Sequence, residues 1–289
     1  MCIRDRRYDG TVLHCRSAHM EFSAPDAKGR VVCTAAAGVT LDDLCREACA
    51  RGLWGIENLS GIPGEVGGAS VQNVGAYGTE WKDVAVEIRS FDTATGRTIS
   101  LSNADCSYGY RDSMFKHLDG PGSLIVYEAV LELSTRPQPV LSYAALQKAF
   151  GDSEPQTLTP EVLRQEVIAL RDAKLPSPAQ TGSAGSFFKN PVVSSEEFER
   201  MQAQSDTPMP GHRLDSGYVK LSAAWLIDKA GCKPLTRGGA ALWPAQPLVI
   251  VNATGRATGA DVVALEQAVI NRVAERFGVT LHPEVIHIG

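Results

Sequence analysis

Apolar positions in the first half of the chain alternate between strand-like and helix-like spacing. Val31–Ala37 is a short apolar run that predicts a buried strand, and the residues after it predict a helix capped by Thr40 and ending near Arg51. A hairpin is expected from Val84–Asp92 and Arg97–Leu101, followed by a longer strand over Ser123–Leu133. We therefore expect a sheet with helices beside it.

Helical spacing dominates the second half of the chain. A helix is expected to begin at Thr159-Pro160-Glu161, because proline is favoured in a first turn, and its apolar stripe continues to Lys174. The other elements expected here are helices after Ser194-Ser195, over Val219–Lys229 and over Asp261–Phe277, and strands over Leu248–Asn252 and Leu281–Ile288.

The stretch Gly52–Gly78 does not fit either period. It carries glycines at 52, 55, 61, 64, 67, 68, 75 and 78, so its backbone can turn tightly and approach a flat or phosphorylated ligand. A mobile loop is the competing interpretation, but apolar residues interleave with the glycines, which favours an ordered, ligand-cradling segment. Neither the dinucleotide-binding fingerprint nor the P-loop pattern is present.

Composition and charge narrow the possible functions. The chain has 289 residues and a formal net charge of −5, which argues against a general nucleic-acid binder. No apolar run reaches membrane-spanning length, and seven cysteines without a C-x-x-C pair fit a reduced, cytoplasmic protein. No metal site is expected, since the histidines and cysteines lack ligand spacing.

Five segments, in order, resemble one enzyme family. They are Gly55–Gly78, Tyr108–Lys116, Gly185–Pro191, Lys220–Gly231 and Pro283–Val285. The chain resembles the UDP-N-acetylenolpyruvoylglucosamine reductases, also called UDP-N-acetylmuramate dehydrogenases, of the subgroup with a tyrosine loop. The resemblance runs from Tyr8 to the last residue.

This resemblance implies a flavoprotein oxidoreductase of peptidoglycan synthesis. NADPH would reduce bound FAD, and hydride would then pass to the enolpyruvyl group of UDP-N-acetylenolpyruvoylglucosamine, giving UDP-N-acetylmuramate. Such an enzyme serves cell wall biogenesis, cell shape, cell division and the cell cycle. We expect a cytoplasmic monomer that uses FAD and NADPH, with the nucleotide sugar as its partner and no nucleic acid or membrane.

The resemblance assigns catalysis to three residues. Arg111 would hold the substrate carboxylate, Glu284 would share that task, and Ser186 would donate a proton to the α-carbon. By composition alone, Arg111 on a surface turn and Ser186 at a polar strand end are the likelier interpretations.

Binding residues are assigned in the same way. Contacts to FAD are expected mainly through the backbone, whereas substrate contacts are expected through side chains. The flavin set is Ile62, Gly64, Gly67, Gly68, Gln72, Asn73 and Gly75, and the substrate set is Tyr110, Tyr143, Lys174, Asn190 and Gln246.

The expected fold class is α+β or α/β, with an FAD-binding domain of the vanillyl-alcohol-oxidase type and a smaller α/β substrate-binding domain. Residues 1–7 do not resemble the family, so we expect an N-terminally truncated flavin domain over 8–175. A linker is expected at Leu175–Gln180, within the start of a substrate domain over 176–278. The last segment, 279–289, is expected to be a strand that carries Glu284. An inactive fragment retaining only nucleotide-sugar binding is the main alternative, and a flavin oxidase acting on another substrate ranks last.

Overall fold

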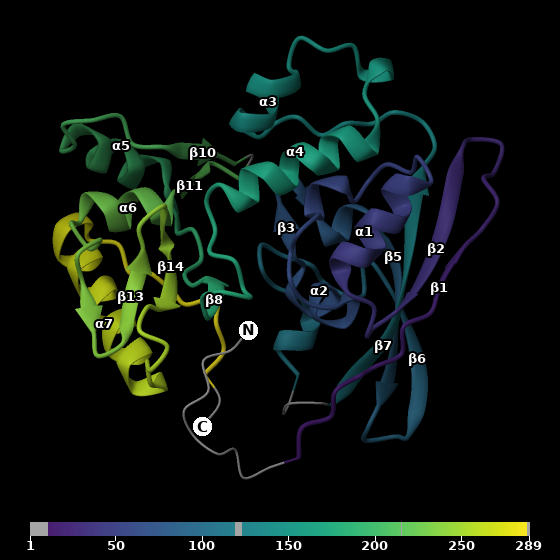
Figure 1. Ribbon diagram of the computed structural model, residues 1–289, viewed down its shortest axis with the longest axis horizontal. Coiled ribbons are helices and arrows are strands. Elements are labelled where there is room, and N and C mark those ends of the chain that lie inside the picture. The colour runs from purple at the N-terminus through teal and green to yellow at the C-terminus, as the bar shows by residue number, and fades with distance from the viewer. Residues whose placement is uncertain (1–10, 119–122, 215, 288–289) are drawn as a thin grey trace. The chain divides into compact units, whose positions relative to one another are not determined.

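The computed structural model describes residues 11–118, 123–214 and 216–287. Residues 1–7 therefore lie outside the described residues, as does Ile288 of the expected C-terminal strand. The described chain forms two compact units, residues 11–171 and residues 172–287 (Figure 1). We call them the first and second unit and describe each by itself.

A five-stranded antiparallel sheet forms the framework of the first unit. Its strand order is β1-β2-β7-β5-β6, and the central strand β7 pairs with both β2 and β5. The expected hairpin is confirmed, with Asp92 opposite Arg97, and so is the long strand after it. The bounds are β1 Met20–Phe22, β2 Arg30–Ala36, β5 Ala85–Asp92, β6 Arg97–Ser102 and β7 Leu124–Ser134.

Helices α1 (Leu41–Ala50) and α2 (Val66–Gln72) share one buried core with this sheet. Thr40 caps α1 as expected, because its hydroxyl accepts the backbone N–H of Asp43 at 3.2 Å. Helix α2 contacts β7 and β2, and Figure 1 draws it next to β7. A short hairpin, β3 (Gly75–Ala76) and β4 (Thr79–Glu80), follows α2.

A smaller core lies under α3 (Ala144–Phe150) and α4 (Pro160–Asp172). It is built from Leu146, Leu163 and Val167 packed with Trp54. The apolar stripe of α4 is confirmed at Leu163 and Val167, which are fully buried. The helix ends at Asp172, so the expected continuation to Lys174 is wrong.

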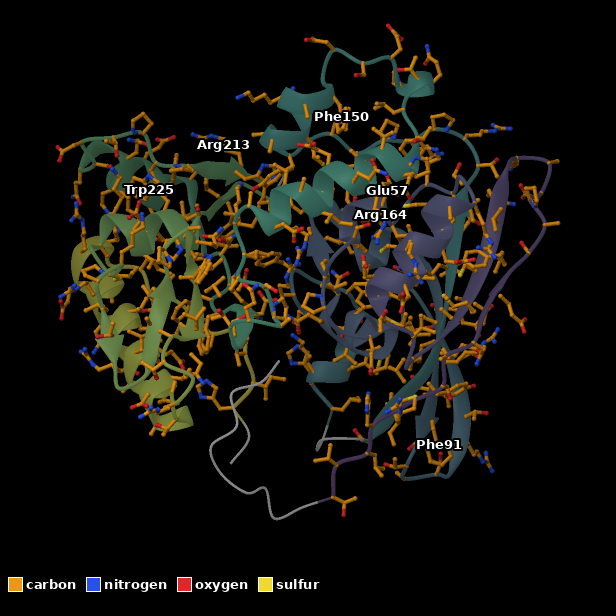
Figure 2. All side chains as sticks on the ribbon, viewed as in Figure 1. Glu57, Phe91, Phe150, Arg164, Arg213 and Trp225 are labelled. Atoms are coloured by element: carbon orange, nitrogen blue, oxygen red, sulfur yellow. The ribbon has the colours of Figure 1, made fainter. Side chains whose placement is uncertain are left out.

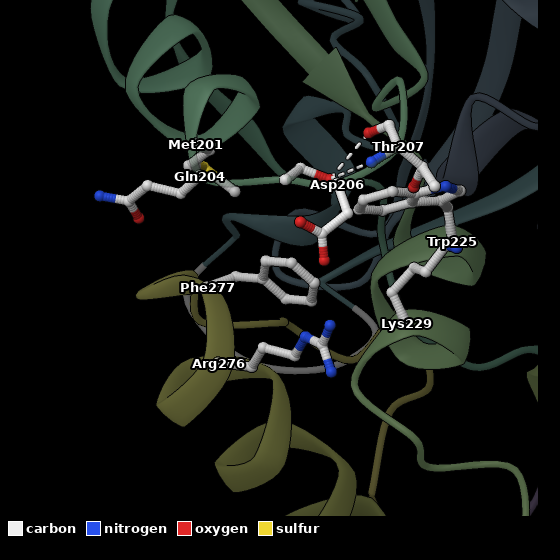
Figure 3. Close-up of a pocket in the computed structure, with 9 residues that line it drawn as sticks. Met201, Gln204, Asp206, Thr207, Trp225, Lys229, Arg276 and Phe277 are labelled. Atoms are coloured by element: carbon white, nitrogen blue, oxygen red, sulfur yellow. Dashed lines mark hydrogen bonds between the residues drawn. The ribbon is translucent and has the colours of Figure 1, made fainter.

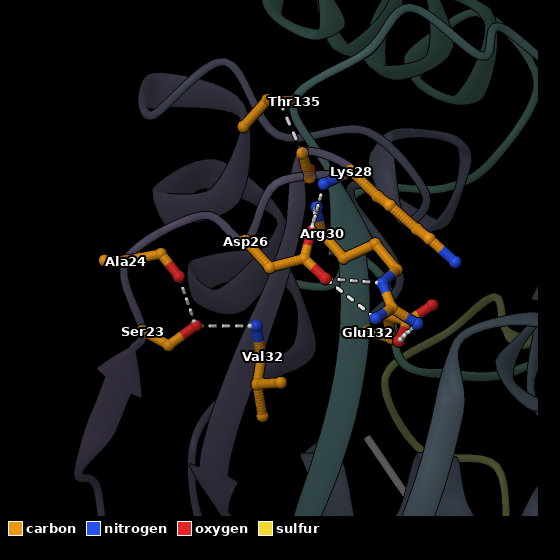
Figure 4. A network of polar contacts seen from close by, with 9 residues as sticks. Ser23, Ala24, Asp26, Lys28, Arg30, Val32, Glu132 and Thr135 are labelled. Carbon is orange, nitrogen blue, oxygen red and sulfur yellow. Dashed lines mark hydrogen bonds and ion pairs between the residues drawn. The ribbon is translucent and has the colours of Figure 1, made fainter.

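The turn between β1 and β2 is held by a polar network (Figure 4). One carboxylate oxygen of Asp26 accepts the backbone N–H groups of Lys28 and Arg30 at 2.8 and 2.9 Å. Gly29 has a φ of 79°, and a Cβ atom there would lie 2.5 Å from the hydroxyl oxygen of Thr135. Only glycine therefore fits this turn without displacing a neighbour.

Two antiparallel sheets form the second unit. One has the order β12-β13-β14-β8 and the other β10-β11-β9. Helix α6 contacts β14, and α7 contacts β12 and β13. The bounds are β8 Ser183–Ser186, β9 Val192–Ser194, α5 Ser195–Ala203, β10 Gly211–Arg213, β11 Tyr218–Leu221, α6 Ala223–Lys229, β12 Thr236–Arg237, β13 Ala240–Trp243, β14 Gln246–Asn252 and α7 Gly259–Phe277.

Two sequence expectations for this unit are wrong. The first residues of the expected helix Val219–Lys229 belong to β11, where Val219 and Leu221 are buried and Lys220 between them is not. Ser222 then caps the shorter helix α6. In the described part of the tail no strand forms: Pro283 makes only an isolated bridge with Phe188. Proline has no N–H to continue a strand ladder.

Candidate functional site

Asn73 joins two sequence motifs of the first unit. Its side-chain nitrogen donates to the carbonyl oxygen of Gly109 at 2.7 Å and to a carboxylate oxygen of Glu80 at 3.1 Å. Its side-chain oxygen accepts the backbone N–H of Lys82 at 3.0 Å. Asn73 is fully buried and has a φ of 45°, a left-handed conformation that asparagine tolerates. The residue thereby fixes Tyr108–Lys116, which we call the arginine loop, against the glycine-rich stretch Gly52–Gly78.

Arg111 itself contacts the glycine-rich stretch. Its guanidinium donates to the carbonyl oxygen of Gly75 and lies 5.2 Å from the ring of Tyr110. A Cβ atom at Gly75 would come within 3.0 Å of the guanidinium, so a glycine permits this approach. Lys116 donates to the carbonyl oxygen of Arg111 at 2.9 Å and to the side chain of Gln72. The structure therefore brings four of the predicted residues, Gln72, Gly75, Tyr110 and Arg111, into one contact network.

The middle of the glycine-rich stretch is ordered by backbone hydrogen bonds to the segment between β2 and α1. The carbonyl oxygen of Gly64 accepts from Leu41 at 3.0 Å, and the N–H of Gly67 donates to Ala37 at 2.9 Å. A bridge between Thr40 and Glu65 lies between these two bonds. The predicted ordered segment is confirmed, and the mobile-loop interpretation is wrong.

One side of this segment remains open. A Cβ atom at Gly64 or Gly68 would meet no heavy atom within 4 Å, whereas one at Gly67 would lie 3.0 Å from the Cβ of Ala37. Gly64 and Gly68 are exposed, and Ile62 nearby is partly buried against the core. The backbone at Gly64 and Gly68 is thus accessible to a flat or anionic ligand, while Gly67 packs on the protein.

Tyr143 lies immediately before α3 and is 41% exposed. Its ring meets that of Tyr77 edge to face, with the centroids 4.9 Å apart. Burial raises the pKa of Tyr77, and the positive charge of Arg171 opposes that rise. The position of Arg171 at the end of a helix predicts a surface charge that complements the helix dipole. In the structure its guanidinium also donates to the carbonyl oxygen of Gly61 at 3.1 Å, so Arg171 contacts the glycine-rich stretch as well.

Ser186 and Glu284 come from neighbouring segments of the second unit. Ser186 ends β8 and is paired with Val249 of β14. The backbone N–H of Glu284 donates to the carbonyl oxygen of Phe187 at 2.8 Å, and Lys189 donates to His282 at 2.9 Å. The chain after Ser186 is therefore hydrogen-bonded to the tail that carries Glu284. Arg111 belongs to the first unit.

The remaining predicted substrate residues lie elsewhere in the second unit. The side-chain oxygen of Asn190 accepts the backbone N–H of Ala223 at 2.9 Å, so this residue also supports the start of α6. Gln246 begins β14 opposite Trp243. The carbonyl oxygen of Lys174 accepts from the indole nitrogen of Trp243 at 3.0 Å. These contacts fix the local backbone of all three predicted residues.

Sequence reasoning missed the anchors of the glycine-rich stretch. Asp42 accepts the N–H of Gly61 at 2.6 Å and is itself held by Arg164. Glu57 is 1% exposed and accepts the N–H of Gly55 at 2.7 Å, and burial raises its pKa. Glu57 and Arg164 are labelled in Figure 2. Asp42 was interpreted only as a first-turn carboxylate of the predicted helix, and the signal for Glu57 was an acidic residue two positions after Gly55.

Metal-binding clusters and membrane-spanning helices are both absent from residues 11–118, 123–214 and 216–287. No group of three or more histidine, cysteine, aspartate or glutamate side chains is placed to hold a metal ion there. None of the helices in the same residues has the length and apolar character needed to cross a membrane.

Comparison with known proteins decides the family. The model of the UDP-N-acetylenolpyruvoylglucosamine reductase C-terminal domain matches residues 177–288, and that of an FAD binding domain matches residues 2–102. A reductase of this name from Bacteroides fragilis strain YCH46 is 41% identical over 96% of the chain and 82% of its own length. The chain belongs to the UDP-N-acetylenolpyruvoylglucosamine reductase family. The family resemblance expected from the sequence is confirmed.

Other reductases of the family are also similar to this chain. The Chromobacterium violaceum protein is 41% identical over 96% of the chain and 81% of its own length. The crystal structure of the Thermus caldophilus reductase matches with a TM-score of 0.59 and 28% identity, covering 90% of this chain and 73% of that one. The expected mixed fold with an FAD-binding part, and FAD as cofactor, are confirmed. The open backbone at Gly64 and Gly68 fits such a cofactor.

Proposed function

We propose that the chain is an NADPH-dependent, FAD-containing oxidoreductase that reduces UDP-N-acetylenolpyruvoylglucosamine to UDP-N-acetylmuramate in peptidoglycan synthesis. Membership of the family and the FAD binding domain support this reaction. The observation that carries the residue assignment is the hydrogen bond between the backbone of Glu284 and Phe187, the residue after Ser186. It joins two proposed catalytic segments that lie far apart in the sequence.

FAD, when bound, supplies the hydride chemistry. Adding hydride to the β-carbon of the enolpyruvyl ether leaves negative charge on the α-carbon and carboxylate. The guanidinium of Arg111 would stabilise that charge by pairing with the carboxylate, because it stays protonated and donates two parallel hydrogen bonds. Glu284 would share this task, and the hydroxyl of Ser186 would give its proton to the α-carbon, completing the reduction.

The binding roles follow the same proposal. Residues 8–175 would hold the flavin, residues 176–278 the nucleotide sugar, and residues 279–289 would carry Glu284. The backbone from Ile62 to Gly75 would contact the flavin, while Tyr110, Tyr143, Lys174, Asn190 and Gln246 would contact the diphosphate and sugars. We propose that the enzyme works in the cytoplasm as a monomer. An inactive protein that only binds nucleotide sugars is not favoured, since a reductase of the family matches over 96% of the chain.

Anaerobic flavin spectroscopy tests the reaction on the full chain. NADPH should bleach the visible flavin absorbance, and UDP-N-acetylenolpyruvoylglucosamine should then restore it without oxygen. A protein that stays colourless with added FAD, or that is bleached but never restored, contradicts the proposal.

Conservative variants test the residue roles. Ser186→Ala, Arg111→Lys and Glu284→Gln should each retain flavin and bleaching by NADPH but lose at least a hundredfold in the rate of restoration, the usual size of one acid or charge-stabilising group. Ser183→Ala is the matched control on the same strand and should restore at the normal rate. A normal rate of restoration of the flavin absorbance in all three variants would contradict the catalytic roles proposed for Arg111, Ser186 and Glu284.

A further inference from the structure

A hollow in the second unit lies between the ends of three helices (Figure 3). Its volume is about 160 Å³. The rings of Trp225 and Phe277 form an apolar wall, with their centroids 5.8 Å apart and their planes tilted by 42°, and the buried side chain of Met201 also lines it. None of the lining residues comes from β8, from the segment after it or from the tail with Glu284.

Two cations border this aromatic wall. The Lys229 ammonium lies 5.8 Å from the ring of Trp225, and the Arg276 guanidinium lies 5.5 Å from the ring of Phe277. Asp206 supplies one carboxylate to the lining, so two positive charges and one negative charge leave a net charge of +1. Such a lining favours a ligand that combines a flat apolar ring with a negative charge.

Helix ends alone do not explain the arrangement. Lys229 and Arg276 lie in the last turns of α6 and α7, where cations complement the helix dipole. That effect requires neither the partly exposed pair of rings nor a hollow beside them. Large apolar side chains that face an open concavity are typical of binding sites.

The loop after α5 gives the hollow a fixed wall. The hydroxyl of Ser205 donates to the carbonyl oxygen of Thr207 at 2.8 Å, and the side-chain oxygen of Gln202 accepts the N–H of Met209 at 2.7 Å. These bonds hold Asp206 between them at a defined turn. A site whose loop is already ordered loses less conformational entropy when a ligand binds.

We propose that this hollow binds a small aromatic carboxylate, with its ring on Trp225 and Phe277 and its carboxylate near Lys229 and Arg276. The volume suits one ring system, since an engineered protein cavity of about 150 Å³ binds benzene. Asp206 disfavours ligands with several negative charges and can accept an N–H from a heterocycle. The site is separate from the residues assigned to the reductase reaction.

Three indole probes of equal ring size and different charge test the proposal on the full chain. Indole-3-acetate is the anion, tryptamine the cation and tryptophol the neutral compound. Saturation-transfer NMR and the indole N–H signal of Trp225, assigned with Trp225→Phe, report binding. Indole-3-acetate should bind saturably, and tryptamine should bind at least tenfold more weakly.

Charge variants complete the test. The substitutions Lys229→Gln, at a partly exposed position, and Arg276→Gln, at an exposed one, should together raise the Kd for indole-3-acetate at least tenfold. Lys233→Gln is the matched control, because Lys233 follows the same helix but does not line the hollow. Equal affinity for the three probes, unchanged affinity in the double variant, or no saturable binding would overturn the proposal. Because the readout is binding, none of these outcomes bears on the reductase reaction.

Discussion

Arg164 of α4 holds both carboxylate oxygens of Asp42 in α1, at 2.6 and 3.0 Å. Arg164 is 6% exposed, and the same carboxylate also accepts the N–H of Gly61 at 2.6 Å. The hydrogen bonds from Arg164, followed by the one from Gly61, outweigh partial burial and lower the pKa of Asp42. This pair therefore connects two helices to the glycine-rich stretch.

Replacing Arg164 with methionine should destabilise the first unit by about 2 kcal/mol, since bonds to charged groups contribute more than neutral ones and Asp42 keeps some solvent contact. Urea unfolding measures the change. Arg46→Met is the control, because its pair with Asp43 is exposed on both sides and should contribute less than about 1 kcal/mol. Equal losses in both variants would contradict a special role for Arg164.

The same pair predicts a pH dependence. The pKa of Asp42 is lowered in the folded protein, so its contribution is fully present above the unfolded value of about 3.9 and is lost as the pH falls through the folded value. The difference in stability between the wild type and Arg164→Met should therefore shrink in acid. A constant difference down to the lowest pH at which the protein folds would argue against this linkage.

The contribution of Glu57 to stability should change with pH in the opposite direction to that of Asp42. Burial raises its pKa, so the folded state favours the protonated acid and loses stability as the pH rises from the unfolded value of about 4.3 through the raised folded value. Glu57→Gln keeps an oxygen for the N–H of Gly55 and removes the charge. Its stability relative to the wild type should increase with pH, measured by urea unfolding at several pH values. A gain that does not change with pH would contradict this explanation.

Asn73→Ala should destabilise the protein by about 2–4 kcal/mol, because Gly109 and Lys82 lose buried partners and alanine disfavours a positive φ. Asn73→Gly separates the two causes: glycine accepts the conformation, so it should recover about 1 kcal/mol. Both variants should slow flavin restoration by the substrate more than bleaching by NADPH, since the arginine loop loses its attachment. Stability equal to the wild type in Asn73→Ala would show that these bonds contribute little.

His287 should hold the tail that carries Glu284. Its ring nitrogen lies 3.1 Å from the carboxylate of Glu266 on α7. We expect His287→Gln to speed amide exchange of Glu284 about two- to fivefold, the size expected for the loss of one partly exposed polar contact. Hydrogen exchange followed by NMR measures it, with the exposed His282→Gln as control. Equal exchange in both variants would mean that the pair does not restrain the tail.

Local signals allowed most of the first unit to be predicted. Thr40 capped its helix, and the Thr93–Gly96 turn set the register of β5 and β6, because each depends on neighbouring residues alone. The glycine-rich stretch was predicted as ordered, but its anchors Asp42, Arg164 and Glu57 were not. They act through contacts between distant positions, which no periodicity records.

Errors in the second unit have a similar cause. The apolar residues Val219 and Leu221 are compatible with a strand and with the start of a helix. In the structure this segment is the strand β11, because it pairs with β9 and β10. The resemblance, rather than any pattern, named Ser186 and Glu284. The bond between Glu284 and Phe187 is long-range, so the sequence alone could not predict it.

The central position of β7 has a consequence for synthesis. Both β2 and β5 pair with a strand that is translated after them, at residues 124–134. Until residues 124–134 have been translated, β2 and β5 each expose an unpaired edge, and the sheet can be completed only when β7 emerges. The growing chain should therefore depend most on chaperones just before that point, and slowing translation there should favour aggregation over folding.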